Sequence, residues 1–144
     1  MFQSQYSLLE DHRCSKMLLP SKAIAVLHKH KDEVWIVRFS NSGKKLATVS
    51  KDNLICLWSL NYDNIQSSAT KNLGKLKVKC THEIKGHSKE TLALSWTNQD
   101  DRYIVTCGKD HMVRMWDTKS GRMRLEIDRH CEAVQNVFFT QDDQ

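Results

Sequence analysis

The same spaced set of three side chains occurs twice in this sequence, and the beginning of a third copy follows. Each full copy holds a His, an Asp 22 or 23 positions later, and a Trp six positions after the Asp. An aromatic residue also lies nine positions after each His. A period of this size indicates one supersecondary unit repeated side by side, and such arrays mostly build binding surfaces. The spaced residues are His30, Asp52 and Trp58 in the first copy, His87, Asp110 and Trp116 in the second, and His130 in the third.

Short apolar runs bounded by Asn, Asp, Ser and Gly fill the chain from Ala23 onward. Runs of this kind predict β-strands, and no stretch shows the sustained period of a capped helix, so the sequence predicts an all-β fold. The run VWIVRF at 34–39 is nearly all apolar, as expected for a strand covered on both faces. The expected strands are 24–27, 33–39, 45–49, 54–58, 76–84, 91–96, 103–107, 112–116, 123–127 and 133–139.

The spacing of the repeats also suggests how the 144 residues are organised. Trp58 and His87 are 29 positions apart, whereas Trp116 and His130 are 14 apart. The 15 additional residues, around 61–75, are polar, which predicts an exposed inserted loop. We expect a lead-in arm or linker at 1–22 and one repeat domain at 23–144. Its repeats are expected at about 28–60 and 86–127, with the start of a third at 130–144.

Composition limits the class of protein. The chain is 40% hydrophobic, as in globular proteins, and carries a net charge of +5 from 22 basic and 17 acidic residues. The first 14 residues lack the basic start and apolar run of a signal peptide, and no apolar run approaches membrane-spanning length. We therefore expect a cytoplasmic and/or nuclear protein without a membrane contact, whose five cysteines are free thiols.

Gly-His at the start of a four-strand unit and Trp-Asp at its end are typical of a WD-repeat propeller blade. Gly86-His87 and Trp116-Asp117 stand at these places, and the chain resembles WD-repeat β-propeller proteins. More narrowly, it is similar to the family of WD-repeat subunits of the GID/CTLH ubiquitin ligase. The residues behind that similarity are 7–14 (SLLEDHRC), 32–35 (DEVW), 39–43 with 46–48 (FSNSG and LAT), 50–52 (SKD) and 95–108 (SWTNQDDRYIVTCG).

The resemblance implies a hydrogen-bonded tetrad in each blade. The Asp accepts from the His, the imidazole reaches a strand hydroxyl, and the hydroxyl reaches the indole N–H of the Trp. A buried carboxylate needs such partners, because an isolated one is very costly. Ser50 is a second candidate hydroxyl in the first blade, but Gly108 stands at the matching position of the second, which favours the Thr residues. The predicted tetrads are His30, Thr48, Asp52 and Trp58, then His87, Thr106, Asp110 and Trp116, with His130 beginning a third.

Two blades are too few for a closed propeller, which has about 4–8 blades. The predicted fold is therefore a partial, open propeller: two complete four-stranded blades with flanking strands at 24–27 and 133–139. We expect either a fragment of a longer propeller or a chain that completes itself by association. Because uncovered apolar flanks favour association, the isolated chain is expected to be marginally stable and to self-associate. The repeats also depart from the family pattern at Lys29, Ser59 and Arg129, where Gly, Asp and Gly are usual.

Three chemical interpretations compete with a structural one. The His–Asp pairs contain the groups of an acid–base pair, but no nucleophile accompanies them, so we expect no catalytic residues. Cys and His occur close together at 80–82, 107–111 and 130–131 without paired-ligand spacing, so we expect no metal and no cofactor. The Lys-rich stretch 71–89 lacks a nucleic-acid motif and is better interpreted as a solvated loop.

Trp35, Lys51 and Lys109 are the candidate partner-binding residues. The resemblance implies that these positions reach the face where WD-repeat proteins bind partners, and aromatic side chains are common anchors there. A core position is the alternative for Trp35, because its neighbours are apolar, and the two lysines are otherwise simply solvated.

The leading hypothesis for function is a non-enzymatic scaffold that binds other proteins. The resemblance implies assembly of a GID/CTLH-type ligase, or recruitment of its substrates for proteasomal degradation. One alternative is a WD-repeat adaptor in another complex, such as one for RNA processing or signalling. A second alternative is nucleic-acid binding through the basic surface. The specific substrates and partners are not encoded in any recognisable motif.

Overall fold

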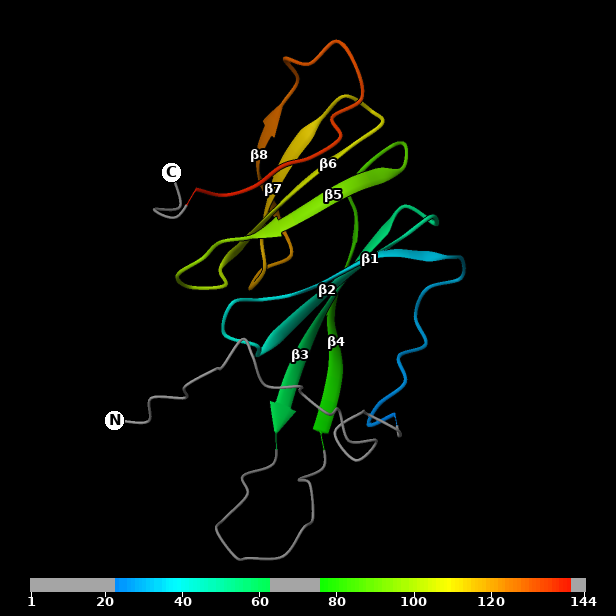
Figure 1. Cartoon of the computed structure of the whole chain (residues 1–144), viewed down its shortest axis with the longest axis vertical. Helices are drawn as coiled ribbons and strands as arrows, with labels where there is room; N and C mark the ends of the chain where they lie inside the picture. Colours follow the sequence, from blue (N-terminus) through cyan, green and yellow to red (C-terminus); the bar gives the residue numbers. More distant parts are fainter. Residues whose placement is uncertain (1–22, 63–75, 141–144) are drawn as a thin grey trace, which may run out of the picture.

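The computed structural model describes residues 23–62 and 76–140, which form two four-stranded antiparallel β-sheets (Figure 1). In both sheets, strands that follow one another in the sequence are neighbours in space. The first sheet, called blade A here, contains β1 (Val34–Phe39), β2 (Lys45–Ser50), β3 (Leu54–Tyr62) and β4 (Leu76–Lys85). The second, blade B, contains β5 (Thr91–Trp96), β6 (Tyr103–Gly108), β7 (Val113–Asp117) and β8 (Met123–Ile127). The prediction of an all-β, open partial propeller is confirmed.

The two blades share the same local irregularities. The pairing of β1 with β2 shifts register between Val34 and Ile36, and the pairing of β5 with β6 shifts between Thr91 and Ala93. Each shift is a bulge that bends the start of the inner strand. The turn after the second strand also repeats, with Asn53 and His111 at φ angles of 61° and 66°. Asn and His tolerate this left-handed conformation better than most side chains, which helps these sequences to turn here.

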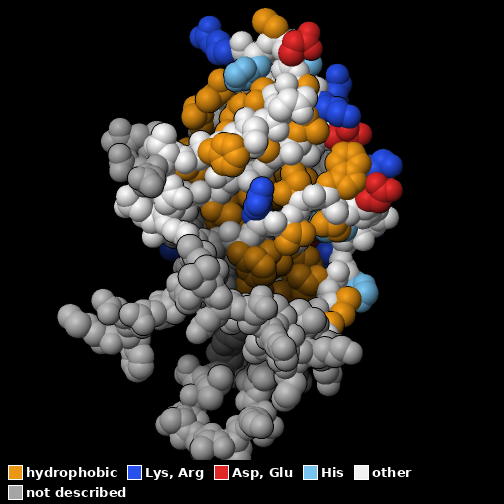
Figure 2. Space-filling model, viewed as in Figure 1, with side chains coloured by type: hydrophobic (Ala, Val, Ile, Leu, Met, Phe, Trp, Pro, Cys, Tyr) orange, Lys and Arg blue, Asp and Glu red, His pale blue; other side chains and the backbone are white. Residues whose placement is uncertain are grey.

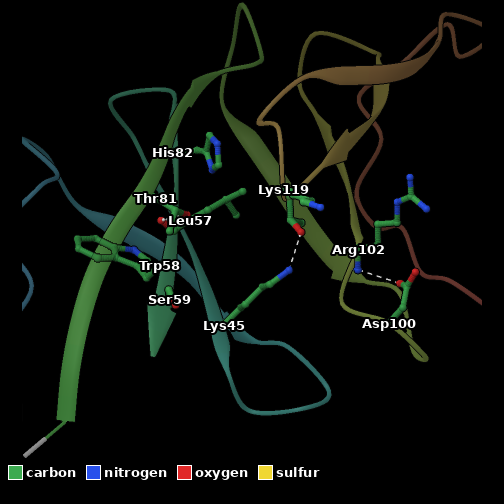
Figure 3. A pocket seen from close by; sticks show the side chains of 10 residues that line it. Lys45, Leu57, Trp58, Ser59, Thr81, His82, Asp100, Arg102 and Lys119 are labelled. Carbon is green, nitrogen blue, oxygen red and sulfur yellow. Dashed lines mark hydrogen bonds between the residues drawn. The ribbon is translucent and has the colours of Figure 1, made fainter. Parts of the chain in front are cut away.

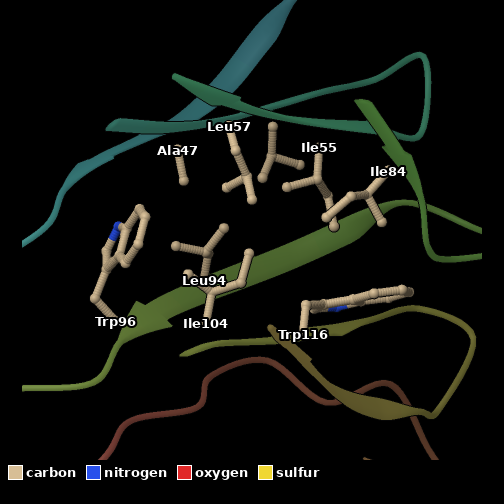
Figure 4. Close-up of a cluster of buried hydrophobic side chains, with 9 residues drawn as sticks. Ala47, Ile55, Leu57, Ile84, Leu94, Trp96, Ile104 and Trp116 are labelled. Carbon is tan, nitrogen blue, oxygen red and sulfur yellow. The ribbon is translucent and has the colours of Figure 1, made fainter. Parts of the chain in front are cut away.

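The main core lies between the two blades (Figure 4). Side chains of β2, β3 and β4 point down from blade A onto side chains of β5, β6 and β7 of blade B. Ile55 and Ile104 at its centre are fully buried. At about 25 cal/mol per Å² of apolar surface, this layer is the largest contribution to holding the blades together. Its residues are Ala47, Val49, Ile55, Leu57, Ile84, Leu94, Trp96, Ile104 and Trp116.

Each blade also has an outer apolar face that turns away from the other blade. On blade A the cluster consists of Leu46, Cys56, Trp58 and Leu60, and Leu27 packs against it. On blade B the cluster consists of Ala93, Val105, Cys107 and Val113. The segment 133–140 runs across this second face (Figure 1), and its Val134, Val137 and Phe139 pack against the cluster.

The prediction that residues 24–27 and 133–139 form flanking strands is wrong. Both segments lie along an apolar face, but neither is part of a sheet. A strand forms when its backbone N–H and C=O groups pair with those of a neighbouring strand. Within the described residues these two segments make only isolated backbone hydrogen bonds. One of these joins the Val134 N–H to the Gly108 carbonyl at 3.2 Å.

The prediction that the strand at 34–39 is covered on both faces is also wrong. Val37 and Phe39 are 53% and 63% exposed, because no sheet lies over the outer face of β1 among the described residues. Figure 2 shows hydrophobic side chains grouped on this side of the molecule. The inserted loop begins later than expected, since Asn61 and Tyr62 belong to β3. The predicted arm at 1–22, the rest of the loop at 63–75 and residues 141–144 lie outside the described residues.

Candidate functional site

The four tetrad residues predicted for blade B lie in one hydrogen-bonded chain. The Trp116 indole N–H donates to the Thr106 hydroxyl at 2.9 Å, and Thr106 Oγ1 lies 2.8 Å from His87 Nε2. His87 Nδ1 lies 2.8 Å from Asp110 Oδ1. In one proton arrangement Thr106 donates to Nε2 and the Nδ1–H donates to Asp110; the Arg114 Nη1 that lies 2.8 Å from Nδ1 then donates to Asp110 and not to the ring. This network joins the loop before β5 to the turn after β6 and to β7.

Arg114 joins this network, although the sequence interpretation did not include it. Its guanidinium donates to Asp110 Oδ2 at 2.7 Å and to Glu126 Oε2 at 2.6 Å. Burial raises the pKa of the Asp110 carboxyl, but the hydrogen bonds from Arg114 and His87 outweigh this and hold it far below its ordinary value. A charged residue within the otherwise apolar run 113–116, two positions before the Trp, was the available signal.

Burial lowers the pKa of His87, and the neighbouring Asp110 opposes this only in part. The His87 side chain is 0% exposed and that of Asp110 is 4% exposed. An acid–base pair must reach a substrate, and this one is shielded on every side. The arrangement therefore suits a structural network rather than proton transfer to a ligand.

The tetrad of blade A has the same layout with looser geometry. Trp58 donates to the Thr48 hydroxyl at 3.0 Å, and Thr48 Oγ1 lies 2.7 Å from His30 Nε2. The last link is long, because His30 Nδ1 and Asp52 Oδ2 are 3.4 Å apart. Cys56 stands at the place of Arg114, so Asp52 has no guanidinium partner here.

The structure therefore brings eight of the nine predicted tetrad residues together, four in each blade. His130 is exposed, and within residues 23–62 and 76–140 no Thr or Asp side chain hydrogen-bonds to it. Gly86 supports the tetrad of blade B, since a Cβ atom at this position would lie 2.5 Å from Trp116 Cζ2. The Gly-His pair thus makes room for the Trp ring. The role of the tetrads in fixing blade geometry stays a prediction.

A second polar cluster, which the sequence did not reveal, joins the two blades at the opposite end. The Ser42 N–H donates to Asp101 Oδ1 at 3.3 Å, and the Ser42 hydroxyl donates to Asp101 Oδ2. Lys45 Nζ donates at 2.9 Å to the Asp101 carbonyl and to Thr118 Oγ1. Burial raises the pKa of Asp101, but the hydrogen bonds from Ser42 outweigh this and hold it below its ordinary value. This cluster sets the relative position of the blades.

Lys45 also spans a cleft of about 580 Å³ between the blades. Figure 3 shows His82 and Thr81 on the side of β4, and Lys119 and Arg102 on the side of blade B. The Lys45 ammonium group reaches across the cleft to the Thr118 hydroxyl. Most of the residues that line the cleft are polar or charged, and Leu57 and Trp58 add apolar surface. Among the described residues, no three His, Cys, Asp or Glu side chains gather as they would around a metal ion.

The three candidate partner-binding residues lie at the tetrad end of the blades. Trp35 is 44% exposed and donates its indole N–H to Glu33 at 3.0 Å, so it is not a core residue. Lys51 and Lys109 are exposed and line a hollow of about 410 Å³ between the blades. Lys109 pairs with Glu90 across part of this hollow. We call this the tetrad-end surface. It comprises Trp35, which bonds to Glu33, and the residues that line the hollow, which are Asp32, Lys51, Asn53, Lys89, Glu90 and Lys109.

The repeated blade, its tetrad and the stacked sheets define a WD-repeat protein. The family model of the WD domain, or G-beta repeat, matches residues 21–59 and 78–117, which together exceed half of the sequence. The chain belongs to the WD-repeat family.

Similar proteins carry the same repeats. The chain is 38% identical to the "WD repeat-containing protein 26 homolog" of Arabidopsis thaliana, over 82% of this chain and 18% of that protein. It is 36% identical to the "WD repeat-containing protein WDS homolog" of the same plant, over 93% of this chain and 22% of that protein. It is also 29% identical to a subunit of chromatin assembly factor 1 from Gallus gallus, over 77% of this chain and 20% of that protein. The chain thus spans about a fifth of the length of these relatives.

A solved structure supports the fold. The β-propeller domain of Cps50 (Swd1) from Myceliophteria thermophila matches with a TM-score of 0.57 and 22% sequence identity, over 77% of this chain and 30% of that one. Within the described ranges there is no helix with the length and apolar character needed to span a bilayer.

Proposed function

We propose that this chain is a non-enzymatic protein-interaction scaffold of a GID/CTLH-type ubiquitin ligase. In this role it binds ligase subunits or presents substrates for proteasomal degradation, in the cytoplasm and/or nucleus. The proposal is supported by the WD-repeat family, by the identity to the "WD repeat-containing protein 26 homolog", and by the sequence similarity that covers 7–14 and 95–108. We also propose a lead-in arm at 1–22 and a repeat domain at 23–144.

The observation that carries the scaffold function is the tetrad-end surface. Trp35 is exposed and its indole bonds to Glu33, which is next to Asp32 in the sequence, and Asp32 belongs to a hollow that charged side chains of both signs line. The apolar ring offers an anchor, and the rim offers charges that select a partner. Backbone hydrogen bonds from Lys51 to the Glu33 carbonyl and from Lys109 to the Glu90 carbonyl, both at 2.9 Å, hold the turns that carry these lysines, which supports a surface positioned before a partner arrives.

Co-purification from cells tests the proposal. The tagged chain is expected to recover subunits of a GID/CTLH-type ligase, and the variant Trp35→Ala is expected to lose at least tenfold of that recovery. Lys44→Ala, on an exposed turn at the other end of blade A, is the matched control and should recover the same subunits. Equal recovery by both variants would exclude the tetrad-end surface, and the absence of ligase subunits would exclude the ligase.

A second candidate is an adaptor in a chromatin complex. It is favoured by the similarity to the chromatin assembly factor 1 subunit of Gallus gallus, at a lower identity of 29%. The same purification separates the two, because histones or chromatin proteins would replace the ligase subunits. Nucleic-acid binding through the basic surface remains a third candidate, and its affinity would fall steeply with salt.

A further inference from the structure

The outer face of blade A is open at a place where the equivalent face of blade B is closed. Val37 and Phe39, seven and nine positions after His30, are 53% and 63% exposed. Their equivalents after His87 are Leu94 and Trp96, which are 4% and 7% exposed. The residue types and the strand are equivalent, so the difference arises because blade A covers blade B and nothing described covers β1.

The interface between the blades shows which surface fits such a face. Leu94 and Trp96 pack in one cluster with small and branched apolar side chains on the inward face of blade A. The matching positions of blade B lie on its own outer face and are also small and branched. The inward residues of blade A are Ala47, Val49 and Ile55, and the matching residues of blade B are Val105, Cys107 and Val113.

The outer face of blade B is occupied by the chain's own segment 133–139. Val137 and Phe139 lie seven and nine positions after His130 and pack against this face. They hold on blade B the place that Leu94 and Trp96 hold on blade A. The segment is irregular, whereas β1 is already paired with β2 along its length. A paired strand is ordered before it docks, so it loses less conformational entropy on binding than an irregular segment does.

Leu27 plays the corresponding part on blade A. It lies three positions before His30 and packs on the outer cluster, as Ile84 lies three positions before His87 and packs between the blades. Each outer face thus carries a short segment in the place that a blade holds in the interface between blades A and B. Leu27 contributes one side chain to its cluster and segment 133–139 contributes three, whereas nine buried residues form the core between the two blades.

We propose that copies of this chain associate head to tail, with blade A of one copy displacing segment 133–139 from blade B of another. Val37 and Phe39 of the incoming copy then cover Val105 and Val113, and Ile127 of the receiving copy takes the place of Leu27. The contact is heterologous, since it joins different faces of the two copies. Such contacts build rings when the rotation closes and open filaments when it does not.

Sedimentation velocity on the full 144-residue chain over a wide concentration range tests this mode. Phe39→Asp places a charge in the contact and is expected to weaken association at least tenfold, which is about 1.4 kcal/mol. The double variant Val137→Asp/Phe139→Asp removes the competing segment and is expected to associate at a concentration at least tenfold lower. Phe138→Asp is the matched control, since Phe138 is 69% exposed and lies outside the blade B cluster, and it should behave as the unaltered chain.

The decisive variant combines all three changes. If association is head to tail, Phe39→Asp in the Val137→Asp/Phe139→Asp background returns the chain to a monomer. Association that persists in the combined variant, or a double variant that associates no more readily than the unaltered chain, overturns the proposal. Far-UV circular dichroism shows that each variant keeps its strands, and Val37→Asp repeats the test at the second exposed position.

Discussion

Replacing Trp116 with Phe tests whether the tetrad stabilises blade B. The indole donates to Thr106 at 2.9 Å, and its ring is 6% exposed within the core between the blades. Phe keeps most of the apolar contact but leaves the Thr106 oxygen without its donor, at a cost of about 1 kcal/mol. The smaller ring leaves a cavity that adds a similar amount. We expect Trp116→Phe to lower the free energy of unfolding by about 2 kcal/mol.

Trp35→Phe is the matched control, because it makes the same substitution at an exposed indole. Trp35 is 44% exposed and bonds only to Glu33, so the expected change is within about 0.5 kcal/mol. Urea unfolding followed by circular dichroism, at one concentration where the chain is monomeric, measures both. With a slope of about 2 kcal/mol per M, the Trp116 variant should unfold at about 1 M less urea. Equal midpoints for the two variants would refute the structural role of the tetrad.

Three further changes probe the same contacts. Gly86→Ala should destabilise the chain by about 1–3 kcal/mol, because its Cβ meets the Trp116 ring, and the loss measured in urea should shrink in a Trp116→Phe background. Lys45→Met removes the hydrogen bonds from Lys45 to the Asp101 carbonyl and to Thr118, and should lower the melting temperature below that of the control Lys44→Met. Equal melting temperatures would contradict the bridging role. The pKa of His87 is below 6.5 when folded, so the unfolded chain binds more protons. Stability should fall as the pH drops below about 6.5, and His87→Gln should flatten that dependence in urea melts at about pH 7.5 and 5.5.

Much of the fold could be predicted because it depends on neighbours in the sequence. The alternation of apolar runs with turn residues located the eight strands to within a few residues of their observed ends. The repeated spacing singled out the His, the Asp and the Trp of each copy, but only the resemblance to WD repeats implied that they meet in a hydrogen-bonded network. The resemblance also implied the hydroxyl partners, Thr48 and Thr106.

The contacts of Arg114 and Lys45 were not predictable in the same way. Arg114 reaches Glu126 only after β7 and β8 pair, and Lys45 reaches Asp101 only after the blades stack. Both are charged residues whose partners lie on other strands or in the other repeat. A single sequence contains the charges but not the distances between them.

The sequence by itself determined the repeat, the approximate bounds of the eight strands and the spaced His, Asp and Trp residues, because these follow from short-range pattern and spacing. The tertiary structure decided which apolar faces are covered. Residues 24–27 and 133–139 have the composition of strands but are not strands, since their pairing partners would have to come from elsewhere. Phe39 and Trp96 occupy equivalent positions, yet one is exposed and the other buried. Burial is a property of what lies opposite a side chain, and that is settled only when separate parts of the chain meet.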